Sequence, residues 1–325
     1  MPSRAQFLQT ALALAVSAIT SLHALAADAW PSKPIRLVVP YPPGGSSDII
    51  ARSIGQLISQ ELKQPVVIEN KPGANGNLGA ELVARAQPDG YTWLLCDLGA
   101  LAISPSVYTK LAFDPSKDLR GAAMLAYSPH MLVVHPSVPA SNLKELVELS
   151  KKQDLNFAVT ATGSAPHLAG VELARVTGAK WVYVPYKGGV QSVQDTVAGQ
   201  TQVLMNGMLA TYPHVQSGKL KLLGISKDSR MPLIADVPTL AEQGAKGFAS
   251  GTWQGVVVPA KTPDAVVQRI NQALLSAIRT PDVRARLTGQ GAEVVTMTPA
   301  DTDRFFNAER QRWRTVVQSA NLQLD

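Results

Sequence analysis

Two short turns rich in glycine and serine are the segments of this sequence best suited to holding an anion. The first, at 42–48, reads Pro-Pro-Gly-Gly-Ser-Ser-Asp, and the second, at 160–166, reads Thr-Ala-Thr-Gly-Ser-Ala-Pro. Each follows an apolar run typical of a buried strand and precedes a helical pattern. Backbone N–H groups at a helix N-terminus are unpaired, and the helix dipole there favours negative charge. The two turns therefore predict a site for a carboxylate or a phosphate.

Glycine lets a ligand approach the backbone of such a turn closely. Ordinary strand-to-helix connections have the same composition, so one turn alone does not predict a site. Two of them on separate lobes would hold an anion from both sides of a cleft, and this is the arrangement that we expect.

Motifs for catalysis or metal binding are absent from the sequence. It contains no G-x-S-x-G nucleophile elbow, no P-loop and no H-E-x-x-H pair. The segment from Ser141 to Lys144 fits S-x-x-K, but it opens an amphipathic pattern, so we interpret the segment as a helix cap. His130 and His135 are five residues apart on or near a predicted strand, where odd spacing places side chains on opposite faces. We therefore expect no catalytic residues, no metal and no cofactor.

The elements that must position the two turns alternate between strands and helices. Nine apolar runs predict buried strands: Ile35–Pro40, Pro65–Glu69, Tyr91–Cys96, Met131–His135, Leu155–Thr160, Trp181–Tyr186, Val203–Asn206, Lys221–Ser226 and Gly255–Pro259. Helical patterns begin near residues 47, 143, 167, 190, 262 and 298, and Ser46 and Ser47 are the expected caps of the first. This alternation predicts an α/β fold with largely parallel sheets, and the length predicts two lobes rather than one.

Composition and charge exclude several other classes of protein. Of 325 residues, 46% are hydrophobic and 17% are charged, a balance that forms a core and excludes wholesale disorder. The single cysteine, Cys96, excludes a disulfide framework and a Cys-rich zinc module. The formal net charge of +6 comes from basic residues that form no stripe. We therefore expect a mildly basic, solvated surface and no nucleic-acid partner.

The first 26 residues have the order of a secretory signal peptide. Arg4 supplies a positive charge, residues 7–22 are apolar and uncharged, and Ala24, Leu25 and Ala26 form a small-x-small cleavage site. A membrane anchor is the alternative, but the apolar stretch is short for a span of about 20 residues. We predict cleavage after Ala26 and export to the periplasm.

Several further stretches, in their order along the chain, resemble one protein family. They are Val39–Asp48, Glu69–Gly76, Pro88–Thr92, Gly163–Gly170, Val184–Gly188 and Asp236–Thr239, followed by Trp253, Val258–Ala260 and Trp313. Over nearly the whole of the chain after residue 26, the sequence is similar to the Bug-type extracytoplasmic solute receptors, which are the binding components of tripartite tricarboxylate transporters.

The resemblance implies a two-lobed, type II-like periplasmic binding protein that closes on a small organic carboxylate, without a cofactor and without catalysis. It also implies delivery of the ligand to the membrane permease subunits of the transporter, and we expect a monomer. Residues 27–126 and 249–325 would form one lobe and residues 127–248 the other, with the two chain crossings between them as the hinge.

The ligand-holding loops of the family correspond to the two turns. The residues that carry over are Gly44, Gly45 and Ser46 from the first lobe and Thr162, Gly163 and Ser164 from the second, together with Tyr186 and Lys187, which match a strand-end segment near the cleft. Tyr41, in the matched stretch before the first turn, is also a predicted ligand-binding residue.

Asp97 and Asn206 are two further candidates that depart from the family pattern, in which a small hydroxyl residue and Asp, respectively, are common. Placement at the surface or behind the pocket is the alternative for each. If Asp97 faces the cleft, its charge would repel a second ligand carboxylate and favour a hydrogen-bond donor.

Two other functions remain open, namely a periplasmic hydrolase on the same fold and a ligand-sensing receptor that signals to a sensor kinase. The missing nucleophile–base motif counts against the hydrolase, whereas the sequence does not separate sensing from transport.

Overall fold

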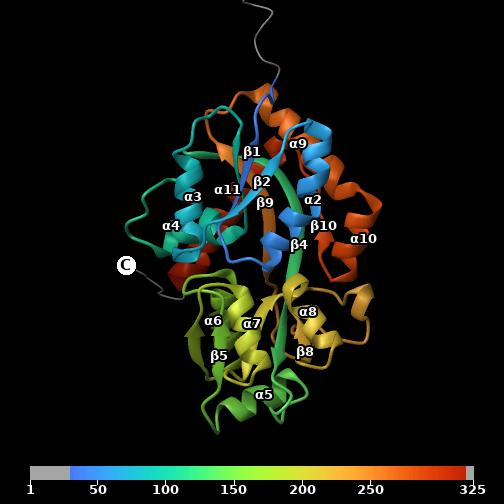
Figure 1. Ribbon diagram of the computed structural model, residues 1–325. Coiled ribbons are helices and arrows are strands. Elements are labelled where there is room, and N and C mark those ends of the chain that lie inside the picture. Colours follow the sequence, from blue (N-terminus) through green and yellow to red (C-terminus); the bar gives the residue numbers. More distant parts are fainter. Residues whose placement is uncertain (1–29, 320–325) are drawn as a thin grey trace, which may run out of the picture.

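The framework of the molecule is one long strand, β4 (Leu119–Val134), which runs through two groups of strands and joins them (Figure 1). The computed structural model describes residues 30–319, so the predicted signal peptide lies outside the described residues. The first lobe adds the strands β1 (Ile35–Val39), β2 (Val66–Asn70), β3 (Thr92–Cys96), β9 (Gly251–Pro259) and β10 (Glu293–Val294). The second lobe adds β5 (Asn156–Val159), β6 (Val182–Pro185), β7 (Val203–Gly207) and β8 (Lys221–Ile225).

Helices pack against the strands of both lobes. The first lobe contains α2 (Ser46–Leu62), α3 (Asn77–Ala84), α4 (Ser104–Val107), α9 (Asp264–Arg279), α10 (Pro281–Gly289) and α11 (Pro299–Ser319), with the short turns η1 (Ala74–Gly76) and η2 (Gly99–Ile103). The second lobe contains α5 (Leu143–Ser150), α6 (Ala165–Thr177), α7 (Gly189–Val197), α8 (Met208–Gln216) and the short turn η3 (Pro232–Ile234). The predicted alternation of strands and helices is therefore confirmed.

Strand β1 of the first lobe is packed on both faces. Ile35 and Leu37 of β1 pack with Ile54 of α2 in one core cluster, whereas Val38 packs with Trp313 of α11 in another. Successive side chains of a strand point to opposite faces. A continuous apolar run is therefore what a sheet covered by helices on both faces requires.

The direction of the strands differs from the prediction of largely parallel sheets. The strand order is β2-β1-β3-β9-β4-β7-β5-β6, with β8 and β10 also paired to β4. The outer strands are parallel, as predicted, with β1 between β2 and β3 and β5 between β6 and β7. However, β9 is antiparallel to β3 and β4, and β4 is antiparallel to β7 and β8. The reason is that β4 carries the chain into the second lobe and β9 brings it back.

The two crossings between the lobes lie next to each other. β4 pairs with β9 as far as Pro129 opposite Gly251, and it pairs with β7 from His130 onward. The backbone N–H of His130 donates to the carbonyl of Ser250, 3.2 Å away. The Ser226 hydroxyl donates to the carbonyl of His130 at 2.9 Å. The side chain of His130 is fully buried at this junction.

The two predicted anion turns begin their helices in different ways. Gly45, not Ser46 or Ser47, is the N-cap of α2, and no side chain caps that helix. The two serines stand in the first helical turn instead, so the expected capping role was wrong. In the second turn Ser164 is the N-cap of α6, and its hydroxyl accepts from the backbone N–H of His167 at 3.3 Å.

Candidate functional site

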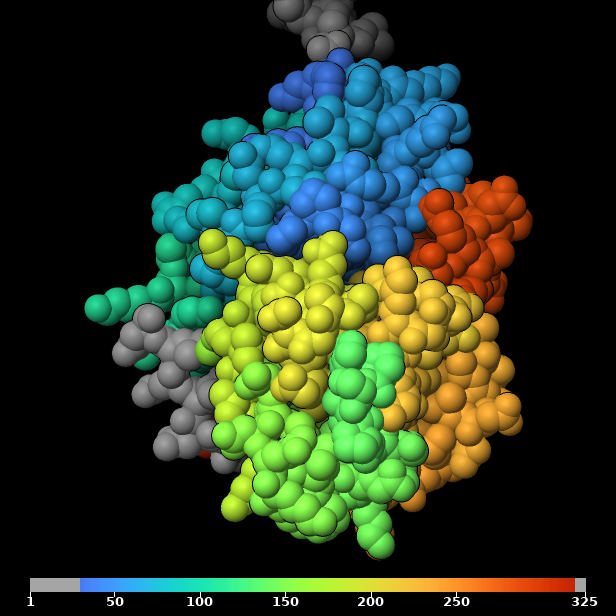
Figure 2. Space-filling model, turned by 60° about the horizontal axis from the view of Figure 1, so that its bottom comes forward, coloured from blue at the N-terminus to red at the C-terminus, as the bar shows by residue number. Residues whose placement is uncertain are grey.

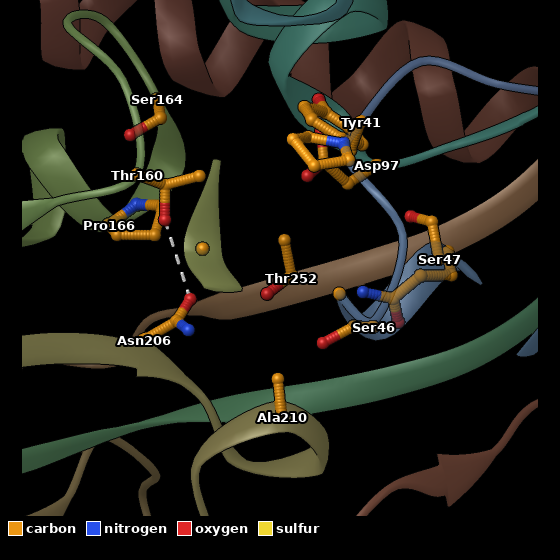
Figure 3. Close-up of a pocket in the computed structure, with 14 residues that line it drawn as sticks. Tyr41, Ser46, Ser47, Asp97, Thr160, Ser164, Pro166, Asn206, Ala210 and Thr252 are labelled. Atoms are coloured by element: carbon orange, nitrogen blue, oxygen red, sulfur yellow. Dashed lines mark hydrogen bonds between the residues drawn. The ribbon is translucent and has the colours of Figure 1, made fainter. Parts of the chain in front are cut away.

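A pocket lies between the two lobes, and both lobes line it (Figure 3). The first lobe contributes Tyr41, Pro42, Gly45, Ser46, Ser47, Asp97, Thr252 and Gln254, and the second contributes Thr160, Ser164, Pro166, Gly189, Asn206 and Ala210. The cavity inside the pocket is small, with a volume of about 40 Å³.

Four helices begin at this pocket. Ser46 and Ser47 open α2, Ser164 caps α6, Gly189 is the first residue of α7, and Ala210 stands in the first turn of α8. The unpaired N–H groups of each first turn carry partial positive charge. Among residues 30–319, no Lys, Arg or His lines the pocket. The positive potential that would attract an anion therefore comes from backbone groups.

The first turn is held in place by a buried carboxylate. Gly44 has φ of +88°, a conformation that favours glycine, and its N–H donates to Asp48 Oδ2 at 2.9 Å. Arg52 and Asn70 also donate to Asp48, at 2.9 and 3.0 Å. Burial opposes the ionisation of Asp48, but these three donors together lower its pKa below the usual value. Gly44 thus shapes the turn without lining the pocket.

The N–H groups that remain unpaired in the first turn belong to the residues that follow. Among residues 30–319 the structure gives no hydrogen-bond acceptor to the backbone N–H groups of Ser46 and Ser47. Both residues line the pocket, so these donors are available to a ligand.

The second turn is organised by His167. Gly163 has φ of +74°, and its N–H donates to Nδ1 of His167 at 3.0 Å. Burial lowers the pKa of His167, which keeps Nδ1 unprotonated and able to accept this bond. Ser164 lines the pocket, whereas Thr162 and Gly163 do not.

Asp97 does face the pocket, and it stands beside Tyr41 (Figure 3). The Tyr41 hydroxyl donates to Asp97 Oδ1 at 2.6 Å, and the N–H of Gly99 donates to the same oxygen at 2.8 Å. Burial raises the pKa of Asp97, since its charge is costly away from water. Burial and the nearby Asp97 charge likewise raise the pKa of Tyr41.

Asn206 also lines the pocket, on the side opposite Tyr41 and Asp97 (Figure 3). It is the penultimate residue of β7, and its Oδ1 accepts from the Thr160 hydroxyl at 3.5 Å. Gln254 of β9 is 1% exposed, and its Oε1 receives no hydrogen bond from the described residues.

A second cavity lies beside the first and shares Pro42 with it. Its wall includes Asn75, Thr162, Tyr186 and Lys187. The sequence-predicted residues are therefore divided: Thr162, Tyr186 and Lys187 line this outer cavity instead of the inner pocket.

Several pocket residues were not predicted from the sequence. They are Pro42, Ser47, Thr160, Pro166, Gly189, Ala210, Thr252 and Gln254. Pro42, Ser47, Thr160 and Pro166 belong to the two turns that the sequence singled out. Thr252 and Gln254 lie on the returning strand β9, which the sequence predicted only from Gly255 onward, so no motif pointed to them.

The lobes touch each other around the pocket. The Asn75 side chain of the first lobe donates to the carbonyl of Gly163 in the second, at 3.2 Å. Ala165 and Leu168 of α6 belong to the same apolar cluster as Leu101 of the first lobe. In Figure 2 the surface of α7, in yellow, meets the blue surface around the start of α2. The molecule is therefore in a closed arrangement.

Within residues 30–319, no three His, Cys, Asp or Glu side chains lie together in a way that could hold a metal ion. No helix there is both long and apolar enough to cross a membrane.

Two lobes joined by adjacent crossings, with a pocket between them, define the class of periplasmic solute-binding proteins. The model of the tripartite tricarboxylate transporter family receptor matches residues 50–322. The chain belongs to this family, which confirms the family resemblance and the fold class predicted from the sequence.

Solved structures agree with this placement. The periplasmic binding protein BugD is 32% identical to this chain with a TM-score of 0.86, and the match covers 90% of this chain and 99% of BugD. An R. palustris protein solved with adipate is 30% identical, with a TM-score of 0.88 and coverage of 91% and 99%. MatC from Rhodopseudomonas palustris, solved with bound malate, is 33% identical, with a TM-score of 0.84 and coverage of 89% and 100%. The family and these neighbours are periplasmic binding proteins rather than enzymes.

Proposed function

We propose that this protein captures a small organic carboxylate in the periplasm and delivers it to the membrane permease subunits of a tripartite tricarboxylate-type transporter. The observation that carries the proposal is the convergence of four helix N-termini on a pocket without a basic side chain. Such a site binds an anion through backbone N–H groups and helix dipoles. The malate and the adipate of the two R. palustris structures are small carboxylates of this kind.

The ligand carboxylate would sit against the first turns of α2 and α6, near Ser46 and Ser164. Gly44 and Gly163 would shape the two turns. The outer cavity with Thr162, Tyr186 and Lys187 would receive the part of a longer ligand that extends beyond the inner pocket.

Binding would favour the closed arrangement, because only there do both lobes contact the ligand. We assign residues 27–126 and 249–325 to the first lobe and residues 127–248 to the second, with the two crossings as the hinge. We further propose a monomer that is exported and cleaved after Ala26. N-terminal sequencing of the exported protein tests the cleavage, and a membrane-bound form that retains Met1 would contradict it.

Calorimetry tests the proposed ligand class. A thermal-shift screen of mono-, di-, hydroxy- and amino-carboxylic acids identifies the tightest binder, because a ligand that binds only the folded state raises the Tm. That acid is then compared with its amide. We expect the amide to bind at least about tenfold more weakly, since a hydrogen bond to a charged group contributes about 1.5–3 kcal/mol. Equal affinity of the acid and the amide would contradict the proposal.

A further inference from the structure

We propose that the ligand carries a hydrogen-bond donor, most favourably an ammonium group, at the end opposite its carboxylate, and that Asp97 binds this donor. The inference rests on the proposed function, because it names the second half of the ligand of that same pocket. Its preferred ligand class is therefore an amino acid with separated charges rather than a dicarboxylate.

The first support is the unused oxygen of Asp97. Oδ1 accepts from Tyr41 and from Gly99, at 2.6 and 2.8 Å. Oδ2 receives no hydrogen bond from any described residue. An ionised carboxylate offers about four acceptor positions and no donor. A carboxylate that lines a pocket in this state is complementary to a donor on the ligand.

The second support is the absence of a counter-charge. No Lys, Arg or His lines the pocket, and Asp97 forms no ion pair within residues 30–319. The other carboxylate near the first turn, Asp48, is paired with Arg52. A second ligand carboxylate near Asp97 would therefore meet a like charge in a partly dehydrated site, whereas an ammonium group would be attracted.

The third support is the polarity of the pocket along its length. Tyr41 and Asp97 lie on one side, and Asn206 and Ala210 lie on the other (Figure 3). Gly189, the first residue of α7, is next to Asn206, since a Cβ atom added to it would lie 3.2 Å from Nδ2 of Asn206. Ala210 belongs to the first turn of α8. Ser46 and Ser164, near which the ligand carboxylate would sit, also lie apart from Asp97 in Figure 3. The pocket thus separates its negative group from its helix N-termini, which matches a ligand with a cation and an anion at opposite ends.

A structural role is the competing explanation for Asp97. Its bond to the N–H of Gly99 stabilises the start of the helical turn η2, and a capping residue needs no more than that. However, Ser, Thr or Asn would cap the turn equally well without placing a charge in the pocket. A capping role alone predicts no effect of Asp97 on the choice between ligands.

Matched ligand pairs separate the two explanations. Calorimetry compares succinate with β-alanine and adipate with 5-aminopentanoate, because in each pair an ammonium group replaces one carboxylate of the diacid. For the wild-type protein we expect the amino acid of a pair to bind about tenfold or more tightly than its diacid. Asp97→Asn should weaken binding of the amino acid by about tenfold or more and leave binding of the diacid unchanged or tighter.

Asp282→Asn is the control, because it removes the same charge from the exposed first turn of α10. It should alter neither affinity, and circular dichroism should show that both variants are folded. A wild-type protein that prefers the diacids, or an Asp97→Asn variant that binds the amino acids as tightly as wild type, would overturn the inference and leave the proposed function standing. Failure of every carboxylate to bind would instead contradict the proposed function, and the inference with it.

Discussion

Among the single residues, Asp97 is the one at which ligand binding and stability have opposite requirements. Burial raises its pKa, although bonds from Tyr41 and Gly99 oppose the shift. The folded protein thus retains this proton to a higher pH than the unfolded chain, in which Asp titrates near 3.9. The contribution of Asp97 to stability is therefore present at acid pH and is lost as the pH rises through the raised pKa.

The raised pKa of Asp97 predicts how Asp97→Asn changes the stability of the ligand-free protein. At pH 7 the variant avoids a buried charge while its Oδ1 still accepts from Tyr41 and Gly99, so we expect a higher Tm than wild type. The gain should shrink as the pH falls toward 4, because the wild-type carboxyl is then protonated. Thermal unfolding at several pH values measures this, with Asp282→Asn as the control. If Asp97→Asn had a lower Tm than wild type at pH 7, this would contradict the inference that the ionised Asp97 carboxylate destabilises the folded protein.

The pocket residues differ in how far they could be predicted from the sequence. Ser46 and Ser164 belong to turns whose composition indicates a helix N-terminus, so their position followed from local chemistry. Thr252 and Gln254 lie in the pocket because β9 returns beside β4, and that pairing is between residues far apart in the chain. No local pattern encodes such a neighbour. The orientation of Asp97 was likewise left open, because it depends on Tyr41, 56 positions away.

At the scale of elements, the N-terminus of α2 is the part of the pocket whose backbone donors can be tested separately. Ser46 is the first residue of the helix, a position where proline is tolerated because its N–H has no helical partner. The preceding Gly45 is extended, with φ of −77° and ψ of 171°, as a residue before proline should be. Ser46→Pro therefore removes one donor from the pocket without breaking the helix.

We expect Ser46→Pro to bind the carboxylate at least about tenfold more weakly than Ser46→Ala, which removes only the hydroxyl. The free energies of unfolding of the two variants should agree within about 1 kcal/mol, since proline suits this position. Calorimetry and urea unfolding provide the two measurements. If the two variants bind the acid with equal affinity, the backbone N–H of Ser46 does not contact the ligand.

The element that the sequence predicted least well is β4. Only the segment from Met131 was predicted, whereas the strand begins at Leu119. The missed part has three Ala residues, one Gly and Pro129. It changes register with β9 between Gly121 and Ala123 and again between Met124 and Ala126. Bulges of this kind disrupt the alternation of side chains on which a strand prediction depends. The pairing with β9 decides the structure of this segment.

At the scale of the whole molecule, the junction between the lobes contains a titratable group. Burial lowers the pKa of His130 to about 3, while an unfolded His titrates near 6.5. Between these values the unfolded chain binds a proton that the folded protein does not. The contribution of His130 to stability is therefore constant above pH 6.5 and is lost as the pH falls toward 3.

Replacing His130 by Gln should remove the loss of stability that His130 causes as the pH falls. For one proton the slope is about 1.4 kcal/mol per pH unit, so the stability of wild type should fall faster than that of His130→Gln between pH 6 and 4. Urea unfolding at several pH values measures how the free energy of unfolding of each protein changes with pH. The comparison of these two slopes does not depend on any difference in stability between the proteins at pH 7. His135→Gln, which alters a partly exposed histidine, should retain the wild-type slope. Equal slopes for wild type and His130→Gln would contradict the assignment.

Gly188 of the second lobe lies close against Pro42 of the first in the closed arrangement. A Cβ atom added to Gly188 would lie 2.7 Å from Cδ of Pro42, too close for the closed arrangement. The φ of Gly188 is 172°, an extended value that any residue adopts, so alanine should not strain the backbone itself. Gly188→Ala is therefore a steric obstacle to closure that leaves each lobe intact.

We expect Gly188→Ala to weaken ligand binding by about tenfold or more, because the open form contacts the ligand from one side only. Small-angle scattering should show less compaction on adding ligand than in wild type, while the Tm of the ligand-free variant stays close to the wild-type value. Gly289→Ala is the matched control, since a Cβ atom there meets nothing within 4 Å. A Gly188→Ala protein that binds and compacts like wild type would mean that ligand capture does not require the lobes to close as far as they do in this structure.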